Sequence, residues 1–425
     1  MEKTTRREIS VYADWPGMKT PTAMGTLRSE LLRGKDLFSF EYDHAWLQSE
    51  YAQVLDPDLQ LFSGLHYLND SEKYNFGLFL DSSPDRWGRV LMRRREAALA
   101  KAEQRPEQTL FESDYLLGVY DEHRIGALRF KMDINGPFLN ANKKMAAPPW
   151  TSIRELEEIS LKLEADNAPE HPQYLDWLNK LIAPGSSLGG ARPKASVMDN
   201  HNHLWIAKFP SGSDQMNVGG WEMVTCELAK SSGINMAESQ AKKFSSKRHT
   251  FLSKRFDRTT KGERLHFASA MTMLGYTDGH SYKDGASYLE LVEFIANNGA
   301  NVTADLEELW RRIVFYICVS NVDDHLRNHG FLLTPGGWVL SPAFDINPIE
   351  TGTGLSLNIS ESDNTLDLDL AMEVRAYFRL SAEKAASIIA QVKSSVKNWR
   401  TVAQKYGISK AEQDEKARAF LRAEG

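Results

Sequence analysis

The sequence has little cysteine and no long apolar run, and both absences narrow the kind of protein it can encode. Only two cysteines, Cys226 and Cys318, occur in 425 residues, each within an apolar, helix-like run. Such residues are usually buried thiols, so neither a disulfide framework nor a cysteine metal site is expected. No stretch approaches 18 uncharged apolar residues, and the N-terminus has no apolar segment of the secretory type. We therefore expect a cytoplasmic protein without membrane contact.

A large excess of charge of either sign is also lacking. The 51 Lys and Arg residues against 57 Asp and Glu give a formal charge of −6, which predicts no broad DNA-binding surface. One local exception is the stretch 242–264, which contains nine Lys or Arg residues and only two acidic residues, Asp257 and Glu263. This stretch is either a solvated surface or a contact for phosphate or an acidic partner. The length allows two or three packed units.

The order of predicted elements divides the chain into three parts. Residues 1–145 mix short strands and helices, with a strand at Leu37–Tyr42 and a helix capped by residues 81–84 that carries an exposed arginine face. Gly, Pro and Asn between Met132 and Trp150 indicate a linker. Residues 150–257 would hold helices and then strands, and residues 258–425 are mainly helical. The fold class predicted is α+β.

Neither GxGxxG nor the Walker pattern GxxxxGK[ST] is present, but a glycine-rich turn occupies residues 185–190. Glycines and small hydroxyl residues there permit backbone N–H groups to face a phosphate. Two predicted strands, residues 195–198 and 203–209, come next and are joined by a short turn. Lys208 lies near the end of the second strand. A lysine of this kind grips nucleotide phosphates in kinases, where a helix glutamate holds it. Glu222, near the start of a helix predicted from Trp221 to Ser231, is the candidate partner.

The strongest cluster of polar residues is Asn321-Val322-Asp323-Asp324-His325-Leu326-Arg327-Asn328. A hairpin predicted at residues 330–340 separates this cluster from Asp345. Phosphoryl transfer needs a carboxylate beside the attacking hydroxyl and oxygen ligands for magnesium, and Asp323, Asn328 and Asp345 supply that set in kinase order. A purely structural capping loop is the simpler alternative.

His325 and His329 also have the spacing of two zinc ligands on one helix face. A metalloprotease of that type needs Glu directly after the first histidine, and this chain has Leu326 there. Gly330 and the strand after it also argue against a long helix. Zinc is therefore the weaker interpretation.

At this point the chain resembles the HipA family, the kinase toxins of bacterial toxin–antitoxin pairs. The resemblance covers nearly the whole chain in the right order. It rests on Leu80 to Arg86, Ser187 to Lys194, Ile206 to Pro210, Arg255 to Arg258, Asn321 to Asn328 and Phe344-Asp345. It implies a two-lobed, lipid-kinase-related protein kinase fold, with an extra N-terminal α/β subdomain (1–145), a nucleotide-binding part (150–257) and a helical C-terminal lobe (258–425).

The resemblance also implies a role for each matched residue. Asp323 would be the catalytic base, and Asn328 and Asp345 the ligands of Mg²⁺. Residues expected to contact ATP are Ser187, Gly189, Gly190, Lys208, Lys254, Phe256 and His325, with Glu222 and Asp257 in support. Ser187 also matches the serine that family members autophosphorylate. Lys254 departs from the family, because an acidic hinge residue is expected there.

The function implied is an ATP- and Mg²⁺-dependent protein serine/threonine kinase that acts as a toxin and is inactivated by autophosphorylation. Its substrate would be a bacterial protein, for example an aminoacyl-tRNA synthetase. Its partner would be a cognate HipB-like antitoxin with a helix-turn-helix domain, through which alone it would meet DNA. Two alternatives are a catalytically inactive kinase fold serving as co-repressor in a DNA-bound antitoxin complex, and a small-molecule kinase.

Overall fold

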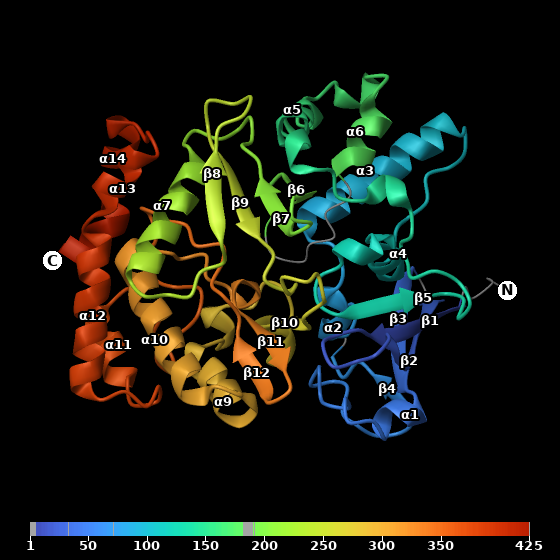
Figure 1. Cartoon of the computed structure of the whole chain (residues 1–425), viewed down its shortest axis with the longest axis horizontal. Coiled ribbons are helices and arrows are strands. Elements are labelled where there is room, and N and C mark those ends of the chain that lie inside the picture. The colour runs from blue at the N-terminus through green and yellow to red at the C-terminus, as the bar shows by residue number, and fades with distance from the viewer. Residues whose placement is uncertain (1–5, 33, 71, 182–189, 191, 425) are drawn as a thin grey trace. The chain divides into compact units, whose positions relative to one another are not determined.

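The computed structural model describes residues 6–32, 34–70, 72–181, 190 and 192–424 (Figure 1). The chain forms two compact units, each interrupted along the sequence. Unit 1 comprises residues 1–212 and 257–268, and unit 2 comprises residues 213–256 and 269–425. No helix among the described residues is long and apolar enough to cross a membrane.

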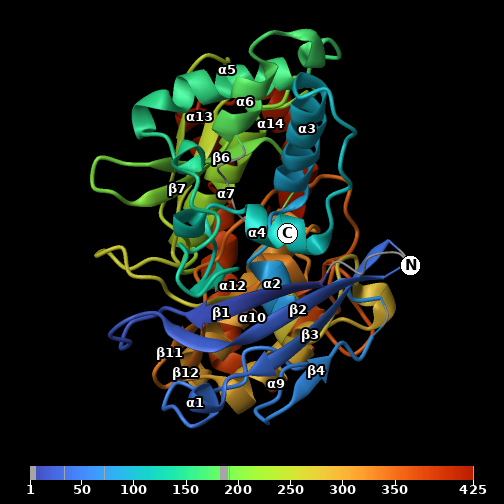
Figure 2. The same ribbon diagram turned by 90° about the vertical axis from the view of Figure 1, so that its right-hand side faces the viewer.

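Unit 1 is built on an antiparallel five-stranded sheet in the order β4-β3-β2-β1-β5, of which Figure 2 shows β1 to β4 side by side. Burial alternates along β3, from Phe38 to Tyr42, so the strand predicted there is confirmed. The buried face carries Ile9, Val11, Leu27 and Phe40, all fully inaccessible. The strands are β1 (Arg6–Ala13), β2 (Thr22–Leu32), β3 (Lys35–Tyr42), β4 (Leu65–Tyr67) and β5 (Leu128–Lys131).

The helices of unit 1 differ from the prediction at one cap. Asp81 ends α2, and Asp85 caps α3 instead, because its side chain accepts a hydrogen bond from the Gly88 amide at 2.8 Å. The arginine face of α3 is only partly exposed, since Arg89 forms an ion pair with Glu112. The helices are α1 (His44–Leu47), α2 (Gly77–Asp81), α3 (Arg86–Ala102), α4 (Glu112–Gly118), α5 (Ile153–Leu163) and α6 (Tyr174–Leu181).

The predicted hairpin of unit 1 is present as β6 (Lys194–Met198) and β7 (Leu204–Lys208). The strands pair antiparallel, with Lys194 opposite Lys208. Their turn is organised by Asp199, whose carboxylate accepts from the amides of His201 and His203. The hairpin therefore places two lysines side by side at its open end.

Unit 2 is mostly helical. Its helix α7 begins at Val218, three residues earlier than predicted, because Asn217 caps it by accepting from the Gly220 amide. Helix α12 packs against α10 and α7 (Figure 1). The elements are α7 (Val218–Ser231), β8 (Ser239–Lys242), β9 (Thr250–Lys254), α8 (Ala270–Met273), α9 (Tyr288–Asn298), α10 (Val302–Val319), β11 (Gly330–Thr334), β12 (Gly337–Leu340), α11 (Leu368–Val374), α12 (Ala382–Val396), α13 (Trp399–Lys405), α14 (Lys410–Lys416) and α15 (Leu421–Glu424). Strand β10 (Phe267–Ser269) crosses the boundary between the units.

Candidate active site

The polar cluster singled out in the sequence forms a loop, residues 321–329, between α10 and β11. Helix α10 ends at Val319, and Ser320 takes a left-handed conformation (φ 51°) that turns the chain out of the helix. A short 3-10 turn, Leu326–Asn328, then leads into β11. Strands β11 and β12 form the predicted hairpin, which is confirmed.

Asp323 and Asn328 lie together in this loop. The Asn328 side-chain amide donates to the backbone oxygen of Asp323 at 2.8 Å, which fixes the orientation of Asn328. Its other side-chain atom, Oδ1, is buried and has no hydrogen-bond partner among the described residues. Asp323 itself is exposed to solvent. The loop thus presents an accessible carboxylate beside an amide oxygen that is available to a cation.

Asp345 joins the same region through Asn347. Asp345 has a left-handed backbone (φ 55°), and the Asn347 side-chain amide donates to its carboxylate at 3.2 Å. The Asn347 backbone amide in turn donates to the Asn321 side chain at 3.0 Å, so the Asp345 segment is tied to the start of the 321–329 loop. The sequence prediction gave no role to Asn347 or to Asn321, although Asn321 belongs to the polar cluster. The signal was an asparagine two residues from each predicted aspartate.

His325 is surrounded by charged residues of the same site. Burial lowers its pKa and Arg327 lowers it further, whereas the carboxylates of Asp323 and Asp345 oppose that shift. The net shift favours the neutral imidazole, and the opposing effects show that it lies near both aspartates. Its Nδ1 is buried without a hydrogen-bond partner in the described part of the chain, as is Nε of Arg327. The zinc-type arrangement does not form, because His329 has an extended backbone just before β11 and does not lie on a helix with His325.

The predicted hinge residues lie in unit 2. Lys254 ends β9 and forms an ion pair with Glu238 at 3.3 Å, and its amide donates to the Glu238 carbonyl at 2.8 Å. Phe256 packs near Phe344, the residue before Asp345, with 5.5 Å between ring centroids. Within unit 2 the hinge therefore contacts the segment that carries Asp345.

The remaining predicted contacts are spread over both units. Glu222 is buried in α7 of unit 2, and Lys208 is half-buried at the end of β7 in unit 1. Their pairing stays a prediction. Ser187 and Gly189 lie outside the described residues, whereas Gly190 has a left-handed backbone (φ 95°), as a glycine-rich turn requires.

The structure gives an ion-pair partner to Lys194, which the sequence prediction did not include among the ATP contacts. Lys194 is the register partner of Lys208, and its ammonium group forms an ion pair with Asp85 at 2.6 Å. Both side chains are only 2% exposed. The same ammonium donates to the Gly190 carbonyl at 3.1 Å. Lys194 therefore anchors the end of the glycine-rich turn. In the sequence, Lys194 and Asp85 belong to separate motifs.

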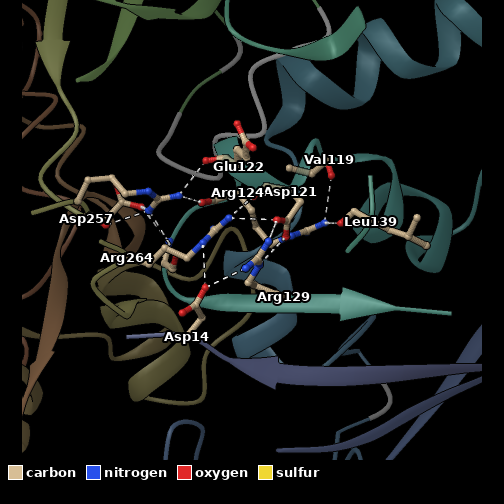
Figure 3. Close-up of polar contacts among 11 residues, drawn as sticks. Asp14, Val119, Asp121, Glu122, Arg124, Arg129, Leu139, Asp257 and Arg264 are labelled. Carbon is tan, nitrogen blue, oxygen red and sulfur yellow. Dashed lines mark hydrogen bonds and ion pairs between the residues drawn. The ribbon is translucent and has the colours of Figure 1, made fainter. Parts of the chain in front are cut away.

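Asp257, predicted as a supporting residue, belongs to an arginine–aspartate cluster of unit 1 (Figure 3). Its carboxylate accepts from the Gly126 amide at 2.9 Å and forms an ion pair with Arg258 at 2.8 Å. Arg258 also donates to the carbonyl oxygens of Glu122 and Arg124. The other members of the cluster are Asp14, Asp121, Arg129 and Arg264. Asp257 thus ties the residues that follow the hinge to the 122–126 segment.

The donor set near Asp323 suits magnesium better than zinc. Among the described residues, no three His, Cys, Asp or Glu side chains are close enough to form a metal site. Magnesium is usually held by one or two carboxylates together with substrate phosphates and water. The buried, partnerless Oδ1 of Asn328 and the carboxylate of Asp345 fit that requirement.

Comparison with known proteins decides the family. The model of the HipA-like C-terminal domain matches residues 186–399, half of the chain. The chain belongs to the HipA family. The serine/threonine-protein kinase toxin HipA of Shewanella oneidensis is 23% identical over 232 residues, which are 49% of this chain and 52% of that protein. A kinase-like protein of Haemophilus influenzae is 25% identical over 179 residues, 38% of this chain and 52% of that protein. This HipA-family chain thus aligns with about half the length of these curated relatives.

The fold of the whole chain is that of a solved HipA-family structure. A chain from the Shewanella oneidensis complex of HipA, HipB and operator DNA matches with a TM-score of 0.63 at 17% sequence identity. The match covers 98% of this chain and 96% of the other. The predicted α+β, kinase-like fold is therefore confirmed.

Proposed function

We propose that this HipA-family chain is an ATP- and magnesium-dependent protein serine/threonine kinase, with Asp323 as its catalytic base. The observation that carries the proposal is the pairing of exposed Asp323 with Asn328, whose buried Oδ1 has no partner in the described chain. A structural capping loop has no use for such an oxygen, because leaving a buried acceptor unsatisfied costs about 1–3 kcal/mol. A cation-binding loop does need it.

Each residue has a stated part in the reaction. Asp323 accepts the proton of the substrate hydroxyl, and the neutral imidazole of His325 donates to a phosphate oxygen. Asn328 and Asp345 would hold the magnesium ion, which neutralises charge on the transferred phosphoryl group when bound. Lys208 grips the nucleotide phosphates, and Phe256 borders the adenine. The left-handed backbone of Asp345 supports this role, because such positions concentrate at functional sites.

The test is phosphoryl transfer from labelled ATP. The purified chain, incubated with ATP, Mg²⁺ and a bacterial lysate, should label a small set of proteins on serine or threonine, and Asp323→Asn should label none. The substrate we propose is a translation protein such as an aminoacyl-tRNA synthetase. Equal labelling by wild type and Asp323→Asn would contradict the assignment. Label on a metabolite instead of a protein would favour a small-molecule kinase.

Self-inactivation at Ser187 is part of the proposal. A phosphoryl group adds about −1.5 to −2 charge, which would repel the phosphates of bound ATP. Lys194 holds Gly190 at the end of the same glycine-rich turn, and its pairing with Asp85 limits the charge it can offer. Mass spectrometry should find phosphate on Ser187 in wild-type protein but not in Asp323→Asn. Phosphate at another residue would contradict this site.

We further propose that the chain is the toxin of a toxin–antitoxin pair and binds a HipB-like, helix-turn-helix antitoxin. The likeness to a structure solved with HipB and operator DNA supports this partner. The net charge of −6 favours DNA contact through the antitoxin rather than through this chain. Tight, sequence-specific DNA binding by the chain alone would contradict that division.

The alternative is a catalytically inactive co-repressor. The resemblance to a chain of a DNA-bound complex favours it, and the donor geometry around Asn328 argues against it. Calorimetry with ATP and Mg²⁺ separates the two, because an inactive scaffold has no need to bind the nucleotide.

A further inference from the structure

Two adjacent aspartates of the 321–329 loop have opposite surroundings. Asp323 is exposed, whereas Asp324 is only 1% exposed. Burial raises the pKa of Asp324 to about 7. A buried carboxyl group costs stability, and its position one residue from the proposed base suggests that this cost serves the site.

The Asp324 carboxyl group links three separate segments of unit 2. Its Oδ2 accepts a hydrogen bond from the hydroxyl of Tyr288, the first residue of α9. Its Oδ1 accepts from the backbone amide of Ser356 at 2.8 Å. The Asp324 backbone oxygen lies 3.3 Å from Nε2 of His329, so the loop is held at its main chain as well. Both oxygens of the carboxyl group are therefore used by the protein, and Asp324 has no free oxygen for a substrate.

The segment reached through Ser356 is a compact loop, residues 352–365. Its ends pair at Gly354 and Thr365, and its Leu357 is fully buried. The Ser356 hydroxyl donates to the Val322 carbonyl at 2.7 Å, which adds a second bond to the 321–329 loop. A Cβ atom at Gly352 would lie 2.3 Å from a methyl carbon of Val322, so any larger residue would force one of the two loops to move. The two loops are thus packed and bonded as one body.

The other edge of the 352–365 loop is tied to the start of α9. The Tyr282 amide donates to the Ser356 carbonyl at 2.7 Å, and the Tyr288 amide donates to the Asn358 carbonyl at 2.9 Å. Tyr288 therefore holds the 352–365 loop through its backbone and Asp324 through its side chain. Removing the carboxyl group of Asp324 would break the hydrogen bonds that join the 321–329 loop, the 352–365 loop and the start of α9.

We propose that Asp324 is a positioning residue, whose carboxyl group fixes the main chain at Asp323 by binding Tyr288 and the Ser356 amide. The catalytic part of this inference rests on the proposed kinase function, and the structural part does not. A catalytic base displaced by about 1 Å loses on the order of 10²-fold in rate. Loss of the Asp324 bonds should therefore lower kcat, while ATP binding, which uses other residues, should change little.

The experiment compares Asp324→Ala with Tyr288→Phe and with the control Glu361→Ala. Glu361 is an exposed carboxylate on the same loop. Alanine removes both acceptor oxygens of Asp324, and Tyr288→Phe removes a single bond and keeps the ring. The measurements are kcat and KM for ATP, and hydrogen exchange of the Ser356 amide. We expect Asp324→Ala to lower kcat about 10- to 100-fold, to change KM less than about threefold, and to speed exchange at least about tenfold.

Each outcome decides the matter. Faster exchange together with a wild type that transfers no phosphate would leave the structural link standing and reject the kinase proposal. Unchanged exchange would overturn the inference, whatever kcat does. A rise in KM as large as the fall in kcat would show a general disruption and also overturn it. If Asp324→Ala does not fold, Tyr288→Phe carries the test, with a kcat loss of about 3- to 10-fold expected, and a wild-type kcat in that variant would contradict the proposal.

Discussion

Two aspartate-rich regions of this protein use the same side chain for different ends. In the arginine–aspartate cluster of unit 1, Asp14, Asp121 and Asp257 each accept from at least one arginine (Figure 3). In the 321–329 loop of unit 2, buried polar atoms of Asn328 and Arg327 have no hydrogen-bond partner in the described chain. In the first region each of these carboxylates is matched by an arginine, whereas in the second the buried Oδ1 of Asn328 lacks a donor among the described residues.

The difference shows what burial of charge achieves in each region. Arg124 is fully buried, and burial lowers its pKa to about 9, while Asp121 acts against that shift. Its guanidinium donates to the carbonyl oxygens of Ser82 and Leu139, which lie far apart in the sequence. The cluster therefore joins segments of unit 1. Substitutions of residues in the cluster should mainly lower stability, whereas substitutions in the 321–329 loop should mainly lower activity.

The largest effect expected is on activity. Asp323→Asn should lower phosphoryl transfer by roughly 10³-fold, about 4 kcal/mol, because the substrate hydroxyl loses its proton acceptor. Stability should not change, since Asp323 is exposed. Labelled-ATP assays and urea unfolding measure the two effects. The control Asp369→Asn, an exposed position on α11, should behave as wild type. An Asp323→Asn protein that is folded and fully active would remove the distinction between the two regions.

The second effect should be a loss of stability without a loss of activity. Asp121→Asn leaves Arg129 and Arg264 with less compensation, so we expect a loss of about 3 kcal/mol in the free energy of unfolding of unit 1. The ATP-dependent activity of the folded protein should stay near wild type. Asp14→Asn is the matched control, because Asp14 is 29% exposed and its loss should cost less than about 1 kcal/mol. Equal losses in the two variants would show that the cluster is not needed for stability.

The third effect depends on pH and concerns the start of α7. Nδ1 of His249 lies 2.7 Å from the Asn217 side-chain nitrogen, and burial, with Lys243 nearby, lowers its pKa to about 4. Because an unfolded histidine has a pKa near 6.5, the folded state binds fewer protons between pH 4 and 6.5. The free energy of unfolding should therefore fall as pH drops below 6.5, by about 1 kcal/mol per pH unit.

Urea unfolding at pH 7 and pH 5 measures this dependence, and His249→Gln should lose the corresponding part of it. A variant with the same pH dependence as wild type would show that His249 does not couple to folding.

The sequence could predict the features that depend on residues close together along the chain. The hairpin after the 321–329 loop and the closeness of Asp323 to Asn328 follow from short spacing and turn chemistry. It could not predict contacts between distant segments. Lys194 and Asp85 are 109 residues apart, and Gly126 and Asp257 are 131 residues apart. Nothing local indicates that either pair meets.

The two aspartates 323 and 324 make the same point within one loop. They are chemically identical and adjacent, so residue type and spacing cannot tell which of them is exposed. The answer depends on Tyr288 and Ser356, each more than 30 residues away, which bury Asp324. This is why the sequence prediction, which chose Asp323 by its place in the kinase order and by resemblance, gave Asp324 no role.

The smallest effect expected is at Lys254, where the chain departs from the family. Its ammonium group pairs with Glu238, which is 64% exposed, so the ion pair contributes less than about 1 kcal/mol to stability. The Lys254 amide is already used by the Glu238 carbonyl, and this bond does not depend on the side chain. We therefore expect Lys254→Ala to change the Kd for ATP less than about threefold, because it leaves the path of the hinge intact. Phe256→Ala removes the ring that packs near Phe344 and should weaken ATP binding more. Calorimetry with ATP and Mg²⁺ compares the two variants, and a larger loss for Lys254→Ala would mean that the lysine side chain itself contacts the nucleotide.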